Sequence, residues 1–241
     1  MSKKIALVTG ATRGIGLETV KQLAQNGVHV LLAGRDKSKA DEAAKGLRDQ
    51  NLDVDSIALD VTDDKSIAAA AGDVEKKYGH LDILINNAGV LADEMGKKPS
   101  EQSASTWRKT FDTNVFGLVE TTKAFLPLLR KSQAGRIVNV SSGLGSLTLH
   151  SDPASAIYNF KIPAYDVSKS AVNAWTVHLA WELKDTAIKV NAIHPGSVKT
   201  DMNSAGSLDV EEGAKSSVEL ALIGNDGPTG SFSHLGQPLP W

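Results

Sequence analysis

The sequence predicts a doubly wound α/β fold, with helices on both faces of one sheet of about seven parallel strands. Two observations predict it. Short, continuously apolar runs, typical of strands buried on both faces, alternate with longer segments of helical periodicity along the whole chain. Alternation at this spacing implies right-handed crossovers between parallel strands. No linker or charge run divides the chain, so residues 1–241 are expected to form a single domain.

Each apolar run ends at a turn former or a polar residue, which bounds the expected strands. These lie at residues 5–8, 28–33, 54–59, 81–85, 136–140 and 188–193. The helical patterns lie at 15–25, 37–50, 63–78, 105–129, 165–183 and 211–222. Residues 143–163 have neither period, and a loop of that length in a compact domain is usually functional or disordered. We therefore place a substrate loop at about 143–163.

Composition excludes several classes of protein. The chain has 26 basic and 28 acidic residues, a net charge of −2, which argues against nucleic-acid binding. It contains no cysteine, which excludes disulfides, thiolate nucleophiles and zinc sites that need sulfur. The histidines show no metal-binding spacing, so no metal is expected. No targeting segment or membrane-spanning apolar stretch is visible, so we expect a cytoplasmic protein without a membrane partner.

A glycine-rich turn, TGATRGIG from Thr9 to Gly16, joins the first expected strand to the first helix. In that setting glycines permit a tight turn, close approach to a pyrophosphate and close packing of helix on strand. The alternative is a glycine turn without a ligand. The turn therefore indicates a dinucleotide-binding (Rossmann) domain, with contacts expected from Gly10, Thr12, Arg13, Gly14, Ile15 and Gly16.

The second expected strand ends in Gly34-Arg35-Asp36, where an NAD site would place a carboxylate for the ribose 2′-hydroxyl. Arg35 together with Arg13 suits a 2′-phosphate, because a guanidinium pairs with phosphate in a planar fork. NADPH is therefore the expected cofactor, and NADH is less favoured. In the alternative interpretation, Arg35 is a solvated charge and Asp36 binds the ribose.

Asp60 and Val61 follow the third expected strand and are further candidates for cofactor binding. The Asp60 carboxylate could accept a hydrogen bond from the adenine amino group. Alternatively Asp60 caps the next helix, although Thr62 or Asp63 would serve better there.

Tyr165 and Lys169 lie four positions apart on an expected helix and therefore share a face. A phenol with an ordinary pKa of about 10 is a poor acid–base group at neutral pH, and a neighbouring ammonium lowers that pKa. Ser142 ends a strand at the same edge of the sheet, which makes the three residues a candidate acid–base site. The alternative is a surface tyrosine and lysine one turn apart.

Further motifs follow one another in a fixed order at strand ends and on helices. They are Asn86-Asn87-Ala88-Gly89, Asn114 in TNVFG, Ser141-Ser142, Tyr165 to Lys169 in YDVSK, and Pro195-Gly196. With the glycine turn, they make the sequence similar to the short-chain dehydrogenase/reductase family from Lys4 to about Leu235. The insertion before Tyr165 and the tail ending in Trp241 resemble its carbonyl-reductase branch.

The resemblance implies a role for each motif. Tyr165 would be the general acid that protonates a carbonyl oxygen, and Ser142, with Ser141 as the fallback, would hydrogen-bond that oxygen. Lys169 would lower the pKa of Tyr165 and bind the nicotinamide ribose, and Asn114 would hold a water for proton relay. The remaining cofactor contacts would come from Asn87, Ala88, Gly89, Pro195, Gly196, Val198 and Thr200.

The chain departs from the family pattern between Ser142 and Tyr165. They are 23 positions apart, roughly ten more than in the family's usual short form. In the carbonyl-reductase branch a longer insertion accompanies a monomeric enzyme, so a monomer and a homo-oligomer both stay open here. Candidate walls of a substrate pocket, with ordinary loop packing as the alternative, are Leu144, Tyr158, Phe160 and Met202.

We expect an NADPH-dependent carbonyl reductase that reduces small-molecule ketones or aldehydes to alcohols by hydride transfer. A 3-oxoacyl-thioester reductase and a specific secondary-alcohol dehydrogenase are alternatives that differ only in the pocket. The alternative from another class is a non-catalytic dinucleotide sensor. The set of Asn114, Ser142, Tyr165 and Lys169 argues against it, because a sensor needs no acid.

Overall fold

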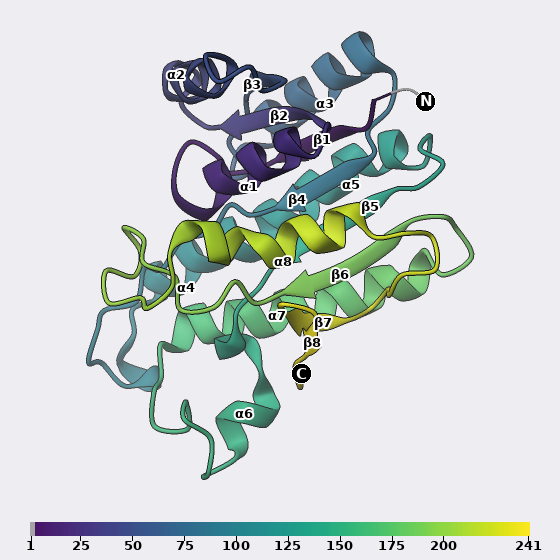
Figure 1. Ribbon diagram of the computed structural model, residues 1–241. Coiled ribbons are helices and arrows are strands. Elements are labelled where there is room, and N and C mark those ends of the chain that lie inside the picture. Colours follow the sequence, from purple (N-terminus) through teal and green to yellow (C-terminus); the bar gives the residue numbers. More distant parts are fainter. Residues whose placement is uncertain (1–2) are drawn as a thin grey trace.

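A computed structural model describes residues 3–241, which are arranged around one sheet of eight strands (Figure 1). The strand order is β3-β2-β1-β4-β5-β6-β7-β8. The strands are β1 (Ile5–Val8), β2 (His29–Gly34), β3 (Val54–Ala58), β4 (Ile83–Asn86), β5 (Arg136–Val140), β6 (Lys189–Ile193), β7 (Phe232–His234) and β8 (Gln237–Pro238). All neighbours from β3 to β7 pair in parallel, and β8 pairs antiparallel with β7. The predicted parallel sheet is confirmed, with one short antiparallel strand added at its edge.

Helices cover both faces of the sheet, as the fold class requires (Figure 1). They are α1 (Gly14–Gln25), α2 (Lys37–Arg48), α3 (Asp64–Tyr78), α4 (Ala104–Phe111), α5 (Gly117–Leu129), α6 (Leu147–Ser151), α7 (Pro163–Glu182) and α8 (Val210–Leu222). Side chains of α1, α2 and α8 pack on one face, and those of α3, α5 and α7 pack on the other. No helix in the described part of the chain has both the length and the apolar composition needed to cross a membrane.

Burial on both faces explains the continuously apolar strands. Val8 and its partner Ile85 face the layer of α1 and α8, whereas Leu7 and its partner Leu84 face the layer of α3 and α5. All four side chains are fully buried. Neighbouring positions therefore both need apolar residues, and the alternating pattern of a half-exposed strand is absent from these two strands.

The helix expected at 105–129 is two helices, α4 and α5, joined by a π-helical turn at Asp112–Phe116. The prediction of one uninterrupted α-helix is wrong at this point. Such turns insert a residue into a helix and are frequent at functional sites. Here the turn carries Asn114, which is 1 % exposed and hydrogen-bonds to the main chain of Val90.

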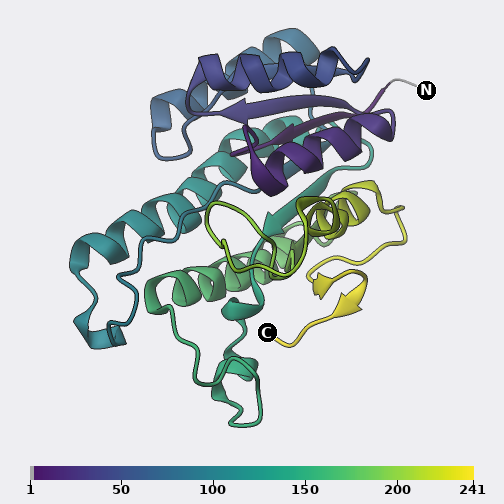
Figure 2. The same cartoon turned by 60° about the vertical axis from the view of Figure 1, so that its left-hand side comes forward.

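The stretch 143–163 is more ordered than its sequence indicates. A 3₁₀ turn at Gly143–Gly145 is followed by α6, a helix of five residues. Ser146 caps α6 by accepting a hydrogen bond from the Leu149 amide. The main-chain oxygen of Trp241 accepts from the Thr148 amide at 2.9 Å, so the last residue lies against α6 (Figure 2).

The strand order changes direction at β1 and β4, which are neighbours in the sheet although far apart in sequence. In open parallel sheets, ligands bind outside the carboxyl ends of strands at such a switch point. The glycine turn after β1, Asn87 after β4, Ser142 after β5 and Pro195 after β6 all lie at that edge.

Candidate active site

The glycine turn between β1 and α1 is built for close packing at both ends. Gly10 has φ +62°, and a Cβ there would lie 2.8 Å from the Cα of Ala88. A Cβ at Gly16 would lie 2.5 Å from the Asn87 amide nitrogen. Any larger residue at either position would push the turn away from the β4 end, so these glycines fix the turn against the sheet.

Gly14 instead borders open space. A Cβ at this residue would meet, among the described residues, only the Thr200 methyl group, at 3.8 Å. The N-cap of α1 is Arg13, which makes no side-chain capping bond, and the first turn of α1 contains no acidic residue. The amides at this helix start therefore lack a competing side-chain acceptor. These features fit the phosphates of a dinucleotide.

The end of β2 separates the two interpretations of Arg35 and Asp36. One oxygen of Asp36 accepts hydrogen bonds from the amides of Ser38 and Lys39 at 3.0 and 3.2 Å, so this carboxylate caps α2. Arg35 is exposed, and no described residue accepts a hydrogen bond from its side chain. The geometry therefore weighs against Asp36 as the ribose ligand and leaves Arg35 available to an anion.

Arg13 contacts a different partner from the one we expected. Its guanidinium donates to the Asp201 carboxylate at 2.7 Å, and both side chains are largely exposed. This ion pair joins the glycine turn to the segment after β6. A surface pair of this kind contributes little to stability and is easily exchanged for another anion.

Asp60 and Val61 lie at the end of β3, as predicted, but Asp60 is not the cap of α3. Its carboxylate accepts from the amide and the hydroxyl of Thr62 at 2.9 and 2.7 Å, whereas Asp63 caps the helix. Val61 is 8 % exposed, and its main-chain oxygen would lie 2.7 Å from a Cβ at Gly117.

Ser142 and Tyr165 meet because the 3₁₀ turn after β5 packs directly on α7. A Cβ at Gly145 would lie 2.8 Å from the carbonyl carbon of Lys169, and Gly145 accepts a hydrogen bond from the Ser170 hydroxyl at 2.9 Å. This contact brings the Ser142 hydroxyl near the Tyr165 phenol, whose pKa that hydroxyl lowers. A glycine at 145 is therefore a condition for the pair to form.

Ser141 is directed elsewhere. Its hydroxyl is buried, donates to the Asn173 side chain at 2.6 Å and lies 3.3 Å from the main-chain oxygen of Lys169. It thus anchors α7 to β5. Of the two serines, Ser142 is the one whose hydroxyl lies beside the phenol.

Burial dominates the electrostatics of Tyr165 and Lys169. It raises the pKa of Tyr165 to about 12, although the Ser142 hydroxyl acts in the opposite direction. It lowers the pKa of Lys169 to about 8. Lys169 Nζ donates to the Val140 main-chain oxygen at 2.8 Å and lies 5.5 Å from the centre of the Tyr165 ring.

The predicted lowering of the Tyr165 pKa by the Lys169 ammonium is therefore not found in this geometry. The ammonium is directed to the end of β5, and the phenol is removed from water without a cation at its oxygen. At neutral pH the phenol keeps its proton. Tyr165 is thus a protonated phenol with a pKa well above neutral pH.

Asn114 connects the loop after β4 to α7. Its amide nitrogen donates to the Val90 main-chain oxygen at 2.9 Å and to the Ser168 hydroxyl at 3.0 Å, and its oxygen accepts from the Val90 amide at 2.7 Å. A Cβ at Gly89 would lie 3.5 Å from that oxygen and 3.6 Å from Lys169 Nζ. Gly89 therefore borders both Asn114 and Lys169.

The segment after β6 extends back over the glycine turn. Gly196 has φ +92°, and short bridges pair Val198 with Leu208 and Thr200 with Asn203. Thr200 lies near Gly14, so the candidate contacts from Pro195 to Thr200 lie at the same edge as the glycine turn.

Three of the four candidate pocket residues are exposed instead of packed. Tyr158, Phe160 and Met202 are 37, 49 and 46 % exposed. Leu144 is partly buried in the 3₁₀ turn after Ser142. Tyr158 has a partner within the loop, Lys161, whose Nζ lies 5.4 Å from the ring centre.

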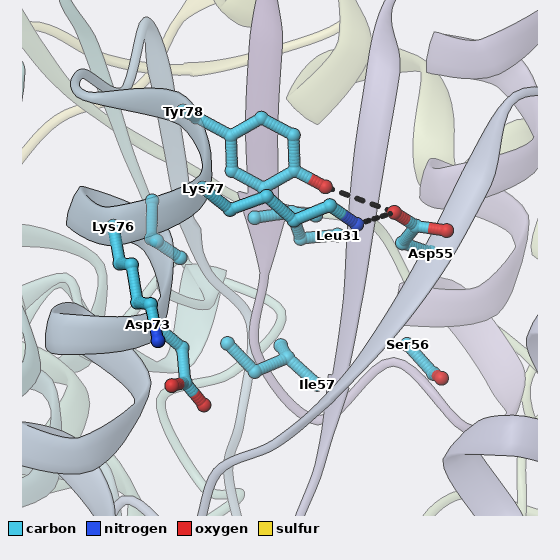
Figure 3. Close-up of a pocket in the computed structure, with 9 residues that line it drawn as sticks. Leu31, Asp55, Ser56, Ile57, Asp73, Lys76, Lys77 and Tyr78 are labelled. Atoms are coloured by element: carbon cyan, nitrogen blue, oxygen red, sulfur yellow. Dashed lines mark hydrogen bonds and ion pairs between the residues drawn. The ribbon is translucent and has the colours of Figure 1, made fainter.

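A cavity of about 520 Å³ lies away from the candidate site, between β3 and α3 (Figure 3). In it Asp55 accepts hydrogen bonds from Lys77 at 2.6 Å and from the Tyr78 hydroxyl at 2.9 Å. Leu31 and Ile57 also line it. The residues lining this cavity include none of those assigned above to the cofactor or to the reaction, so volume alone does not identify the site.

Sequence reasoning missed one buried acid beside the site. Asp93, in the loop after β4, is 8 % exposed and accepts hydrogen bonds from the main-chain amides of Ala164 and Tyr165. No local pattern marks it, because its partners lie more than seventy positions away.

Comparison with known proteins agrees with this geometry. The family model described as short chain dehydrogenase matches residues 4–210. A short-chain dehydrogenase of Penicillium roqueforti, anuI, is 40 % identical over 233 residues, which are 93 % of this chain and 91 % of the relative. Salutaridine reductase from Papaver somniferum superposes with a TM-score of 0.84 and 31 % identity, covering 97 % of this chain and 100 % of the other. NADPH-bound carbonyl reductase from chicken fatty liver superposes with a TM-score of 0.85 and 28 % identity, with both chains fully covered.

Proposed function

Because the chain belongs to the short-chain dehydrogenase/reductase family, we propose that this oxidoreductase is an NADPH-dependent carbonyl reductase that converts ketones or aldehydes to alcohols. One observation carries the proposal. The Ser142 hydroxyl lies beside a phenol that keeps its proton at neutral pH, at the sheet edge that also carries the open glycine turn. Reductases of this family among the similar proteins support the same direction of reaction.

In the proposed reaction Ser142 and Tyr165 bind the carbonyl oxygen together. The Ser142 hydroxyl donates a hydrogen bond to that oxygen and orients the substrate. Tyr165 keeps its phenolic proton at neutral pH and donates it to the oxygen as negative charge develops there. When bound, the cofactor supplies the hydride that the carbonyl carbon accepts.

Lys169 and Asn114 would support Tyr165 after it has donated its proton. Lys169 has a pKa of about 8, so at neutral pH its ammonium stabilises the phenolate that remains after proton donation. Asn114 fixes the loop after β4 against Ser168, whose hydroxyl donates to the Tyr165 main-chain oxygen at 2.7 Å. This connection fixes the position of Tyr165 relative to the cofactor-binding loop.

The residues at the glycine turn would hold the dinucleotide. The amides at the start of α1 would bind the pyrophosphate, with Gly14 leaving room for it. Arg35, together with Arg13 released from Asp201, would bind the ribose 2′-phosphate. Other contacts in the proposal come from Asp60, Val61, Asn87, Ala88, Gly89, Pro195, Gly196, Val198 and Thr200.

The substrate would lie between the 143–163 stretch and the segment after β6, within one dinucleotide-binding domain. The exposed side chains of Tyr158, Phe160 and Met202 would offer an apolar surface to it. A carbonyl compound with a mainly apolar body therefore fits better than a highly charged one.

A cofactor-oxidation screen tests the proposal. Purified chain is given NADPH or NADH and a panel of apolar ring ketones, open-chain ketones, aldehydes and one 3-oxoacyl thioester, and loss of the reduced cofactor is followed. We expect turnover of at least one ketone or aldehyde, faster with NADPH. Turnover of the thioester alone would replace the proposal with an acyl-thioester reductase, and nucleotide binding without turnover of any compound would contradict it.

A further inference from the structure

The start of α7 lacks the usual local cap. The N-cap residue is Ile162, which has no polar side chain, and Pro163 at the first helical position has no N–H group. The amides of Ala164 and Tyr165 therefore remain without partners inside the helix. An unpartnered helix start frays, and Tyr165 lies within this first turn.

Asp93 supplies both missing acceptors from a distant part of the chain. One carboxylate oxygen accepts from the Ala164 amide at 2.7 Å and the other from the Tyr165 amide at 3.0 Å. The side chain is buried, and its charge lies at the positive end of the α7 dipole. Figures 1 and 2 both show the segment between β4 and α4 beside the amino end of α7.

The same loop is fixed on its other side. Three positions before Asp93, the main chain of Val90 is held by both polar atoms of the Asn114 side chain. The loop therefore begins at Asn87, beside the glycine turn, and is held at Val90 and again at Asp93. It is a rigid connection between the proposed cofactor site and the main chain of Tyr165.

A second carboxylate, Asp166, completes the helix start. It accepts from the Ile162 amide at 2.9 Å, and its other oxygen is buried without a partner among residues 3–241. The titratable groups that face it are Asp93 from the loop after β4, His150 from α6 and Lys161 from the segment before α7. Burial and the nearby Asp93 charge raise the pKa of Asp166 to about 7.

We propose that Asp93 is a positioning residue for the reaction. By accepting hydrogen bonds from the first two free amides of α7, it fixes the position of the Tyr165 phenol relative to the substrate. The inference rests on the proposed function, because it acts through Tyr165. Displacement of a reacting group by about 1 Å can lower a rate 100-fold. Asp93 touches neither reactant, so its removal is expected to lower kcat and to leave nucleotide affinity unchanged.

The test compares Asp93→Asn and Asp93→Ala with Asp63→Asn. Asp63 also caps a helix through its carboxylate, but α3 carries no residue assigned to the reaction. Hydrogen–deuterium exchange across the start of α7, NADPH affinity and kcat are measured on each. We expect faster exchange at Ala164 and Tyr165, a kcat lowered roughly 10- to 100-fold, and NADPH affinity within about twofold of the parent. Because asparagine keeps one acceptor oxygen, the exchange rate and kcat of Asp93→Asn should lie between those of the parent and those of Asp93→Ala.

The proposal would be overturned by unchanged exchange at the start of α7, or by a kcat of Asp93→Asn within about twofold of the parent. An equal loss of kcat in Asp63→Asn would assign the effect to general destabilisation and would also overturn it. If Asp93→Ala does not fold, the same measurements on Asp93→Asn decide the proposal. The exchange measurement needs no turnover. If the chain reduces no carbonyl compound, the proposed function is wrong, but the exchange rates still show whether Asp93 stabilises the start of α7.

A pH series measures the coupling between the Asp93 and Asp166 carboxylates. Because the Asp93 charge raises the pKa of Asp166, Asp93→Asn should lower it toward its ordinary range. The pH at which the thermal midpoint changes should therefore shift to lower pH in Asp93→Asn and stay unchanged in Asp63→Asn. No shift in Asp93→Asn would contradict the coupling of the two carboxylates.

Discussion

The side-chain nitrogen of Lys169 donates a hydrogen bond to the main-chain oxygen of Val140 at 2.8 Å. Val140 is the last residue of β5, and Ser141 and Ser142 follow it directly. One bond therefore joins the helix that carries Tyr165 to the strand that positions Ser142. The bond also explains why Lys169 lies under the tyrosine ring, 5.5 Å from its centre, instead of beside its oxygen.

The pH dependence of reduction should report Lys169. Its pKa is lowered to about 8 by burial, so the ammonium is present at pH 7 and lost as the pH rises through 8. We expect the rate of reduction to fall above about pH 8, because the phenolate formed in the reaction then lacks its counter-charge. A steady-state pH profile measures this. A rate that is level from pH 7 to beyond about 10, the ordinary lysine range, would contradict it.

The same shift has a defined effect on stability. The pKa of Lys169 is about 8 in the folded protein and 10.5 in the unfolded chain. Between these two pH values the unfolded chain binds a proton that the folded protein has lost, so stability rises with pH there. Burial of the charged amine is a cost below pH 8 that is relieved as the pH rises. Lys169→Met should therefore raise stability near pH 7 while removing activity, as urea unfolding and turnover would show. A destabilised Lys169→Met at pH 7 would contradict this sign.

Arg35 should determine the preference for NADPH. Asp36 is occupied as the cap of α2, and Arg35 has no partner among the described side chains. A charge-assisted hydrogen bond contributes about 1.5–3 kcal/mol, so Arg35→Ser should weaken NADPH binding roughly 10- to 100-fold and leave NADH binding unchanged. Arg108→Ser, an exposed arginine on α4, is the control. Parent chain that prefers NADH would refute the assignment.

Asp201 should compete with the cofactor for Arg13. Their ion pair is exposed, at 2.7 Å, and would have to open when Arg13 turns to a 2′-phosphate. Asp201→Asn removes the competitor, so NADPH should bind a few-fold more tightly, consistent with the roughly 0.2–1 kcal/mol of a surface pair. Titration by nucleotide fluorescence measures it. Weaker NADPH binding in this variant would show that Asp201 supports the site instead.

The side chains of the 143–163 stretch should govern substrate choice. Phe160 is 49 % exposed and does not serve the core, so Phe160→Ala should change the order of preference among ketones while leaving the folding free energy within about 0.5 kcal/mol. Trp181→Ala, 69 % exposed at the far end of α7, is the matched control. The relative kcat/KM over the ketone panel is the measurement. An unaltered profile, also after removal of 151–160, would contradict a role in substrate binding.

Periodicity predicted the strands and helices well, because both faces of the sheet are covered. It also located every strand end that carries a candidate residue. It could not reveal the π-helical turn at Asn114. Asn114 in that turn hydrogen-bonds to Val90, which lies 24 positions away. The glycine spacing predicted an anion site, but it could not show that Gly14 borders open space while Gly10 is packed.

The electrostatics of the site were less predictable than its residues. Spacing placed Tyr165 and Lys169 on one face of a helix, and opposite charge then predicted a lowered phenol pKa. Burial reverses that direction, and burial depends on the whole fold. The roles of Asp36 and Arg13 likewise depend on partners that adjacent sequence does not identify, the amides of α2 and the Asp201 carboxylate.

The central claim is that Tyr165 donates the proton to the carbonyl oxygen, and Tyr165→Phe tests it most directly. Phenylalanine keeps the ring and removes only the hydroxyl that lies beside Ser142. We predict that the variant binds NADPH with the affinity of the parent and loses turnover of every substrate found in the screen, by a factor of at least about 100. Tyr78→Phe, in the cavity between β3 and α3 and outside the candidate site, should keep its turnover. Turnover by Tyr165→Phe at the rate of the parent would contradict the account.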